Sequence, residues 1–492
     1  MLLCIIRKEI LNGFLSLRLP FTLLLVTALM VSTSFLFLED YQQQLADYDR
    51  NIQDNIQKVD QRADGGSFAL ANVFSLNHQW VYRTPGRLAF LAAGHEKNMP
   101  NAFEVNAFTI RNPTKRLRQN SFLRWAEDLD WAFVISVIMS FAAIVLVYDS
   151  ISGERESGTL RLSMSNPVPR STVILGKYLG TMIMLIIPLL VGMLVSMIII
   201  ITSGKVNLAG VDWVRILVTA LLSLLYLSIF VLLGLFISSL LRSSAASLVL
   251  LLLAWTVIVV VVPSVTGVIT TRLSELPSDT AIGWKAHGAR RKADQEYDAN
   301  HPRSADLLAG YWITRGILGK HLYRNDAFMA VYKDYWDKMV LGVRLGRNVS
   351  RISPCVVYRC AAESIAASGI DHHESFMKQI WQYRASLRNF LVDHYPLDLH
   401  RQYEGDEELE RQAFRACAGV KFTGTDVPRF HDDPIPAGDA MRNSLWDIAV
   451  LFMFNFVFFM AAYISFLRRD VRCCFWVYGS IRSTYRAVTG SE

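Results

Sequence analysis

The sequence predicts a mainly α-helical membrane protein with six transmembrane helices and two large, largely helical extracytoplasmic insertions. Three observations support this fold class. Hydrophobic residues make up 52% of the 492 residues, and the mean hydropathy is +0.27, which is high for a soluble protein. The apolar residues gather in six long, almost charge-free stretches. Two long polar segments separate some of these stretches, and together they are large enough to form domains with cores.

Each apolar stretch can cross about 30 Å of hydrocarbon as a helix that rises roughly 1.5 Å per residue. Only helices and closed barrels satisfy their backbone hydrogen bonds in lipid, and runs this long and continuous favour helices. The predicted spans are 19–38, 130–148, 178–204, 213–241, 243–265 and 445–467.

Two neighbouring stretches need separate interpretation. The run 65–82 also lacks charge, but it contains residues that are costly in hydrocarbon, so we assign it to a soluble domain: Asn72, Asn77, His78 and Gln79. The first span, 19–38, is longer than the apolar part of a signal peptide and ends in SFLFLED, without a small-residue cleavage site. We therefore expect it to be retained as an anchor.

Residues 1–18 precede the first span and have an amphipathic pattern. Apolar residues recur at helical spacing, at Leu3, Ile6, Ile10, Phe14 and Leu17. This pattern predicts a helix that lies on the inner membrane surface. A simple polar flank of the first span is the alternative.

Basic residues predict the orientation. They cluster in the N-terminal stretch, in the loop 149–177, at Arg242 and in the tail 468–492, which all lie on one side if there are six spans. The positive-inside rule makes this the cytoplasmic side, with both termini. The segments 39–129 and 266–444 then lie outside. The net charge of +7 reflects this topology, and we predict no nucleic-acid binding.

The two outer segments are predicted to be largely helical. The first begins with a polar stretch that lacks Pro and Gly as far as Gly65, so we expect a helix that continues the first span outward and stops at Gly65 and Gly66. The second has helical character over 282–298, 323–341 and 374–391, without strong strand alternation.

Cysteine and histidine give weak signals of chemistry. Of the six cysteines, Cys355, Cys360 and Cys417 face outward in this topology. A disulfide between Cys355 and Cys360 could close a small loop, with a bridge to Cys417 as the alternative. All ten histidines fall in the outer segments, where solvated surface positions are their ordinary use. No recognised ligand spacing is present, and we predict no metal site.

Enzyme signatures are missing from the sequence. It contains no GxxxxGK[ST] phosphate loop, no GxSxG and no HExxH, so we predict that the chain is not an enzyme. The spans bury few ionisable residues, which argues against a proton-coupled carrier. Asn455 and Ser196 are polar residues within spans, and each could line a pathway or hydrogen-bond a neighbouring helix.

The loop 149–177 is the most distinctive segment. Gly153 and Gly158 flank a charged patch, and the stretch after them predicts a short helix, with Thr159 as its cap and Leu160 and Met164 on one face. The residues that end this helix and lead into the third span are Asn166, Pro167, Pro169, Arg170 and Lys177. Such a helix could transmit force from a partner, and a solvated connector is the alternative.

This loop resembles a segment of ABC-2 type permeases, the membrane subunits of ATP-binding cassette transporters. The matching residues are Asp149, Ser152-Gly153-Glu154, Gly158-Thr159-Leu160, Asn166-Pro167, Arg170 and Gly176-Lys177. The stretch GRLAFLAAGHEKNMPNAFEVN is similar to the first outer domain of a subgroup with large extracytoplasmic insertions, the DUF3526-like permeases.

The resemblance implies a mechanism. Two permease chains, identical or paralogous, would pair in a bacterial inner membrane above a separate ATPase dimer, which would hold ATP and Mg while this chain binds no cofactor. Residues 153–167 would form a coupling helix seated in the ATPase. Contacts there would come from Glu154, Glu156 and Arg161, with Leu160 and Met164 packing, although Glu154 could instead brace the end of the second span.

The sequence is compatible with three functions. The first is export of a substrate, and the second is ATP-driven movement of the outer domains without substrate passage. The third is a membrane-anchored receptor or enzyme. The large outer segments suggest contact with an extracytoplasmic partner protein or an envelope component.

Overall fold

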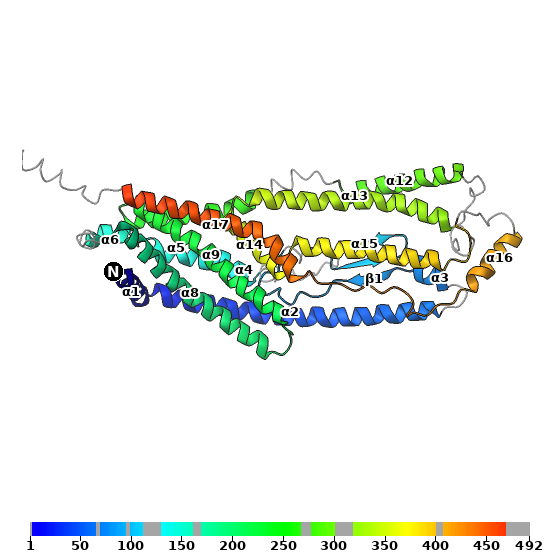
Figure 1. Cartoon of the computed structure of the whole chain (residues 1–492), viewed down its shortest axis with the longest axis horizontal. Helices are drawn as coiled ribbons and strands as arrows, with labels where there is room; N and C mark the ends of the chain where they lie inside the picture. Colours follow the sequence, from blue (N-terminus) through cyan, green and yellow to red (C-terminus); the bar gives the residue numbers. More distant parts are fainter. Residues whose placement is uncertain are drawn as a thin grey trace, which may run out of the picture.

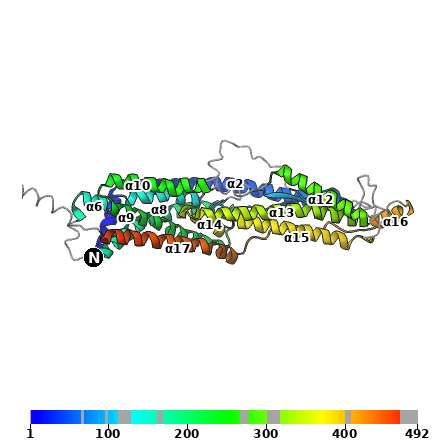
Figure 2. The same ribbon diagram turned by 90° about the horizontal axis from the view of Figure 1, so that it is seen from above.

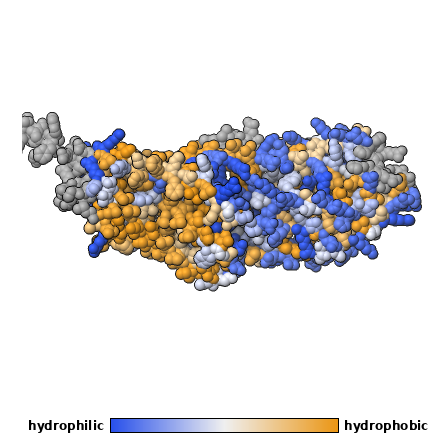
Figure 3. Space-filling model, viewed as in Figure 1, coloured by the Kyte–Doolittle hydropathy of each residue, from blue (hydrophilic) through white to orange (hydrophobic). Residues whose placement is uncertain are grey.

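The computed structural model describes residues 2–64, 69–94, 99–111, 129–160, 169–266, 277–300, 318–399 and 407–468. The molecule is elongated, with a helix bundle at one end and a second, polar body at the other (Figure 1). On the face shown in Figure 3, the bundle is largely covered by apolar side chains, whereas the polar body is largely hydrophilic. We call these two parts the membrane bundle and the outer domain.

The structure confirms six helices long and apolar enough to span a membrane among the described residues. They are Arg18–Ala63 (α2), Trp131–Glu156, Arg170–Thr202 (α8), Gly210–Leu240 (α9), Ser244–Thr266 and Ala437–Arg468 (α17). The second is built from α4 (Trp131–Phe133), η4 (Val134–Met139), α5 (Ser140–Val147) and α6 (Ser152–Glu156). The fifth contains α10 (Ser244–Thr256) and η5 (Val257–Val261).

Helix α2 joins the two parts of the molecule. It has 46 residues, and at 1.5 Å per residue it is about 70 Å long, roughly twice the hydrocarbon thickness. Figure 1 shows it running from the membrane bundle along one edge of the outer domain. Its outward continuation agrees with the sequence prediction, and it ends at Ala63, while the glycine pair expected to stop it lies outside the described residues.

The N-terminal helix α1 (Leu2–Leu15) packs on α8 through two glycines. A Cβ atom at Gly176 would lie 2.7 Å from a side-chain carbon of Ile5, and one at Gly180 would lie 2.7 Å from Glu9 Cβ. Only glycine permits this approach. Apolar side chains such as Leu3 and Phe14 remain exposed on α1. We call the end of the bundle that carries α1 and α6 the loop end.

The outer domain contains a small antiparallel sheet that the sequence did not predict. Its strands are Gln79–Tyr82 (β1), Ala102–Val105 (β2) and Ile110–Arg111 (β3), in the order β1-β2-β3. Gln79 pairs with Val105, and Glu104 pairs with Arg111. The run 65–82, which we excluded from the membrane, contributes α3 (Ala69–Ala71), η2 (Asn72–Leu76) and β1 to this domain.

Helices from the second insertion complete the outer domain. They are α12 (Asp279–Asn300), α13 (Leu318–Ser350), α15 (Ile370–Asp393) and α16 (Glu407–Ala418). The same insertion also contains α14 (Pro354–Ala366), which does not belong to this domain. Phe376 and Ile380 of α15 pack with Phe74 and Val81 in a core separate from that of the membrane bundle. The two insertions therefore fold together as one body.

The sequence predicted that residues 266–444 lie outside the membrane, but helix α14 of this segment packs within the membrane bundle. Figure 2 shows α17 on one flank and α10 on the other, with α9 and α14 between them. The ring of Tyr358 stacks on Tyr226 of α9 at 4.6 Å, and its hydroxyl lies 2.9 Å from Ser223 Oγ. Ser353 Oγ donates to the Ile258 carbonyl at 2.7 Å. Part of the second insertion thus belongs to the core of the bundle.

Candidate functional site

The loop end is organised around α6, a helix of five residues. Its first backbone groups are anchored on α9, because the N–H groups of Ile151 and Ser152 donate to Ser238 Oγ at 3.1 and 3.0 Å. After the helix, Gly158 adopts a φ of +75°, in the left-handed region that favours glycine. This explains why a glycine stands at the turn that the sequence pattern marked.

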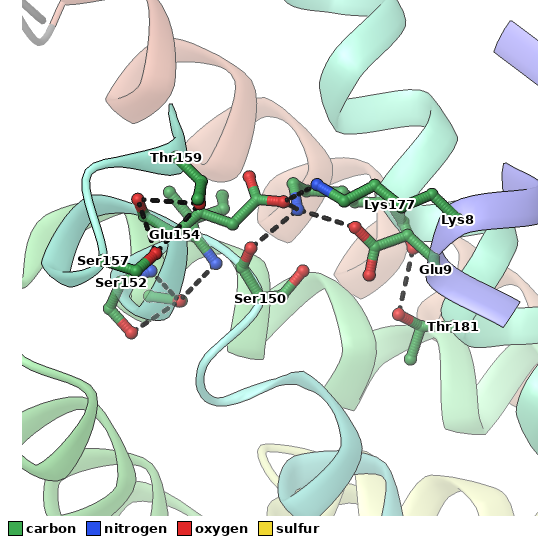
Figure 4. A network of polar contacts seen from close by, with 11 residues as sticks. Lys8, Glu9, Ser150, Ser152, Glu154, Ser157, Thr159, Lys177 and Thr181 are labelled. Atoms are coloured by element: carbon green, nitrogen blue, oxygen red, sulfur yellow. Dashed lines mark hydrogen bonds and ion pairs between the residues drawn. The ribbon is translucent and has the colours of Figure 1, made fainter. Parts of the chain in front are cut away.

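A buried lysine connects α6 to two other helices (Figure 4). Lys177 of α8 is 2% exposed, and its Nζ lies 2.7 Å from Glu9 Oε1 and 3.1 Å from Glu154 Oε1. It also donates to the Ser150 carbonyl at 2.7 Å. A buried ammonium group needs such partners to offset its lost hydration. Lys177 therefore ties α1, α6 and α8 together.

Lys8 closes this network from the solvent side. Its Nζ donates to Glu154 Oε1 at 2.7 Å. Partial burial opposes the charge of Lys8, but the hydrogen bond and the negative charge of Glu154 outweigh it and raise the pKa of Lys8. Glu154 thus lies between two ammonium groups. This geometry supports the alternative in which Glu154 braces the end of the second span.

Arg155 and Glu156 connect α6 to the turn between α9 and α10. Glu156 Oε2 accepts hydrogen bonds from the Ser244 backbone N–H at 3.0 Å and from its hydroxyl at 2.7 Å, at the first residue of α10. A carboxylate is favourable there because the first N–H groups of a helix lack internal partners. Arg155 Nη1 donates to the Leu241 carbonyl at 3.1 Å, at the end of α9. Glu156, expected to contact a partner, is thus engaged within the chain.

Two arginines link the same region to the first and last spans. Arg18 of α2 donates to Asp149 Oδ2 at 2.9 Å and to the Tyr148 hydroxyl at 2.8 Å. Arg170, a predicted site residue, donates to the Leu467 carbonyl of α17 at 2.7 Å. Short polar contacts therefore join residues 148–156 to α2, α8, α9 and α10, and Arg170 joins α8 to α17.

The remaining predicted contact residues divide into three groups. Gly158 and Thr159 are exposed, next to the exposed Ser157. Gly153 lies within α6, where a Cβ atom would meet the side chain of Asp149. Leu160 corrects our expectation, because it is 2% exposed and packs in the core of the membrane bundle instead of offering its side chain to a partner. The others lie outside the described residues: Arg161, Met164, Asn166 and Pro167.

Polar residues within the spans hold helices together. Asn455 Nδ2 donates to the Leu225 carbonyl of α9 at 2.9 Å and to the Leu451 carbonyl of its own helix at 2.9 Å. Ser196 of α8 accepts from Trp131 Nε1 at 3.0 Å and contacts Ser34 of α2. Both residues have the helix-packing geometry that the sequence left as one of two alternatives.

The proposed disulfide is wrong. Cys355, Cys360 and Cys417 are free thiols. Cys355 and Cys360 lie on the single helix α14, five positions apart. This spacing places their Cα atoms about 8 Å apart and their side chains on different faces, beyond the reach of a disulfide.

A second ionic cluster, which sequence reasoning missed, fixes the outer domain to α17. Asp447 is fully buried, and its two carboxylate oxygens accept from Arg347 Nη2 at 2.7 Å and from Arg351 Nε at 2.6 Å. Arg347 also lies 3.3 Å from Asp371 Oδ2 of α15. The only sequence signal was a carboxylate near the start of the predicted span 445–467.

Comparison with known proteins identifies relatives of this chain. A family model described as "ABC-2 family transporter protein" matches residues 3–471. A "Probable ABC transporter permease protein NosY" of Pseudomonas aeruginosa is 46% identical over 43 residues, which cover 9% of this chain and 16% of that protein. The protein of the same name from Stutzerimonas stutzeri is 41% identical over 49 residues, 10% of this chain and 18% of that relative. The chain thus matches less than a fifth of the length of these curated relatives.

Proposed function

The chain belongs to the ABC-2 family of transporter proteins, and we propose that it exports a substrate with energy from a separate ATPase dimer. The family makes it the permease subunit of an ABC transporter. In our proposal two permease chains pair in the membrane. The loop end faces the cytoplasm, because the basic residues of the short loops gather there, and the outer domain faces the periplasm.

The observation that carries the proposal is the set of polar contacts around α6. This helix is too short to have a core of its own, yet it and the residues just before it are bonded to α1, α2, α8, α9 and α10. Many of these bonds involve charged groups, which give stronger hydrogen bonds than neutral pairs. A displacement of α6 by a partner would therefore move several spans together.

The surface we propose for docking the ATPase follows α6. Ser157, Gly158 and Thr159 are exposed there, whereas the carboxylates of Glu154 and Glu156 are engaged within the chain. We therefore assign the partner contact to 157–159, and the bracing role to Glu154 and Glu156. ATP and Mg would bind on the partner.

Steric blocking of this surface tests the assignment. The chain is co-expressed with its cognate ATPase subunit, and the ATPase recovered with the tagged permease is quantified. We expect Ser157→Tyr and Thr159→Arg to reduce recovery at least fivefold, because bulk on a docking surface excludes the partner. Lys205→Tyr, in the exposed loop at the opposite end of the bundle, is the control. Equal recovery for all variants would reject the docking surface.

A second candidate function is ATP-driven movement of the outer domain without passage of a substrate. The position of α14 favours it. This helix fills the space between α9 and α17 within the bundle, and Arg347 and Arg351, just before it, are bound to Asp447 of α17. A movement of α17 would thus reach the outer domain directly.

Cys355 distinguishes the two functions. Its thiol is buried in the bundle, where a substrate pathway beside α14 would expose it. In a variant with all other cysteines replaced by serine, export predicts that a membrane-impermeant maleimide labels Cys355 during ATP turnover. Movement alone predicts no labelling, together with an ATP-dependent change in distance between spin labels on Lys205, in the exposed loop of the bundle, and Lys338, on the outer domain.

A further inference from the structure

The outer domain contains a groove between α12 and α13 that the transport function does not explain. Its cavity has a volume of about 660 Å³, within the range of small-molecule sites. Its chemically distinctive lining residues are Trp284, His287, Arg290, Arg291, Asp294 and Arg324. They lie on one face of α12, except Arg324, which α13 supplies.

The groove carries uncompensated positive charge. The lining contains three guanidinium groups and one carboxylate, that of Asp294, whose Oδ1 lies 3.7 Å from Arg324 Nη1. Within the described parts of the chain, Arg290 and Arg291 form no ion pair. The groove therefore has two more positive than negative side chains, in a concave site where the field is stronger than on a flat surface.

Arg324 is held in place within the groove. Its Nη2 lies 3.1 Å from Nδ1 of the buried His321, with the geometry of a donated hydrogen bond. Burial, and then the positive charge of Arg290, lower the pKa of Arg324. A bound anion would offset the repulsion between these cations. Because the Arg324 guanidinium is already fixed, less entropy is lost when the anion binds.

An exposed tryptophan completes the groove. Trp284 is 76% exposed. This exposure does not stabilise the domain, because water is an unfavourable environment for a large aromatic side chain. The ring of His287 beside it is positioned against Phe328, with ring centroids 5.4 Å apart. An indole face next to guanidinium groups suits a ligand that has both a planar or apolar body and a negative group.

We propose that the α12–α13 groove binds an anionic ligand whose phosphate or carboxylate group is attached to a planar or apolar body. Arg290, Arg291 and Arg324 bind the anion, and Trp284 covers the body. Helix α12 lies in the half of the molecule away from the bundle (Figure 1), and the face of that half seen in Figure 3 is largely hydrophilic. The ligand is therefore a soluble molecule and not a headgroup of the surrounding bilayer.

Calorimetry with phenyl phosphate tests the site in the full chain, held in nanodiscs of neutral lipid without an ATPase. We expect saturable binding that weakens as salt is added. Arg290→Gln/Arg291→Gln should lower the affinity about tenfold or more, because charge-assisted hydrogen bonds are lost. Lys285→Gln/Lys292→Gln removes two charges from α12 outside the groove and should change the affinity less than twofold.

Two further experiments test the role of Trp284 and the origin of the ligand. Trp284→Ala should weaken phenyl phosphate several-fold and leave the weaker binding of inorganic phosphate unchanged. Anionic lipid in the nanodiscs should not compete with phenyl phosphate for the groove. Competition would reject the proposal that the ligand is a soluble molecule. The site itself is rejected if wild-type protein does not bind phenyl phosphate, or if both double variants lose it equally. Neither result affects the ATPase docking test, because no ATPase is present.

Discussion

Lys177 Nζ lies 2.7 Å from Glu9 Oε1, so that a buried ammonium group in the third span is paired with a carboxylate of the N-terminal helix. The two residues are 168 positions apart in the sequence. Together with Glu154 they form the junction at which α6 meets the membrane bundle. The first prediction concerns this junction.

Replacement of Lys177 by Met should destabilise the protein by about 3 kcal/mol, because two partly buried carboxylates lose their shared partner. Thermal unfolding in detergent measures this loss. The triple variant Lys177→Met/Glu9→Gln/Glu154→Gln removes the orphaned charges and should recover much of the stability. A single variant as stable as the wild type would show that Lys177 does not hold the junction together.

The close approach of α1 and α8 predicts sensitivity at Gly180. A Cβ atom there would lie 2.7 Å from Glu9 Cβ, so Gly180→Val should displace α1 and cost about 1 to 3 kcal/mol. Gly288→Ala is the matched control, because a Cβ at Gly288 meets nothing within 4 Å and alanine favours the helix. Chemical denaturation should separate the two variants, and similar midpoints would argue against tight packing of α1.

Asp447→Asn should loosen the outer domain from the bundle. The change removes the buried carboxylate that Arg347 and Arg351 share, leaves Arg347 only its pair with Asp371, and should cost about 3 kcal/mol. Hydrogen exchange should rise in α14 and in the last turns of α13. Asp334→Asn, which removes the exposed pair with Lys338, should leave exchange unchanged. Unaltered protection in α14 after Asp447→Asn would contradict the proposed linkage.

His321 predicts a loss of stability in acid. Burial, and then the neighbouring charge of Arg324, lower its pKa to about 2 in the folded protein, against about 6.5 when unfolded. Below pH 6.5, His321 therefore binds a proton in the unfolded chain but stays neutral in the folded protein. Stability is unaffected above this pH and falls by up to about 1.4 kcal/mol for each pH unit below it. Melting temperatures between pH 7.5 and 5 should fall less steeply for His321→Gln than for the wild type.

Asn455→Leu distinguishes helix packing from a pathway role. Loss of the hydrogen bond to the Leu225 carbonyl should cost only about 0.6 kcal/mol, as is usual for such bonds in membranes. ATP hydrolysis by the complex and labelling of Cys355 during turnover should remain as in the wild type. Loss of that labelling with little change in stability would instead place Asn455 on the pathway.

Several features followed from the sequence because they depend on local properties. The number of transmembrane spans could be predicted, because an apolar run long enough to cross a membrane must satisfy its backbone hydrogen bonds by forming a helix. The outward continuation of α2 was visible because no Pro or Gly interrupts 39–63. The family could be recognised from the residues between Asp149 and Lys177, among which the turn after α6 requires a glycine at 158.

The short strands of the outer domain could not be predicted, because β1 and β2 have four residues each and are separated by an irregular segment. Their pairing depends on packing against α15. The disulfide prediction failed for a related reason, since spacing alone did not show that Cys355 and Cys360 share one helix.

The sequence by itself determined which segments enter the membrane and that the loop after the second span is special. Hydropathy and turn chemistry are properties of neighbouring residues, so they can be read along the chain. Only the tertiary structure decided that Leu160 is buried, that Glu154 and Glu156 are engaged within the chain, and that α14 enters the bundle. These outcomes depend on side chains such as Glu9 and Asp447, which meet their partners only when distant segments pack together.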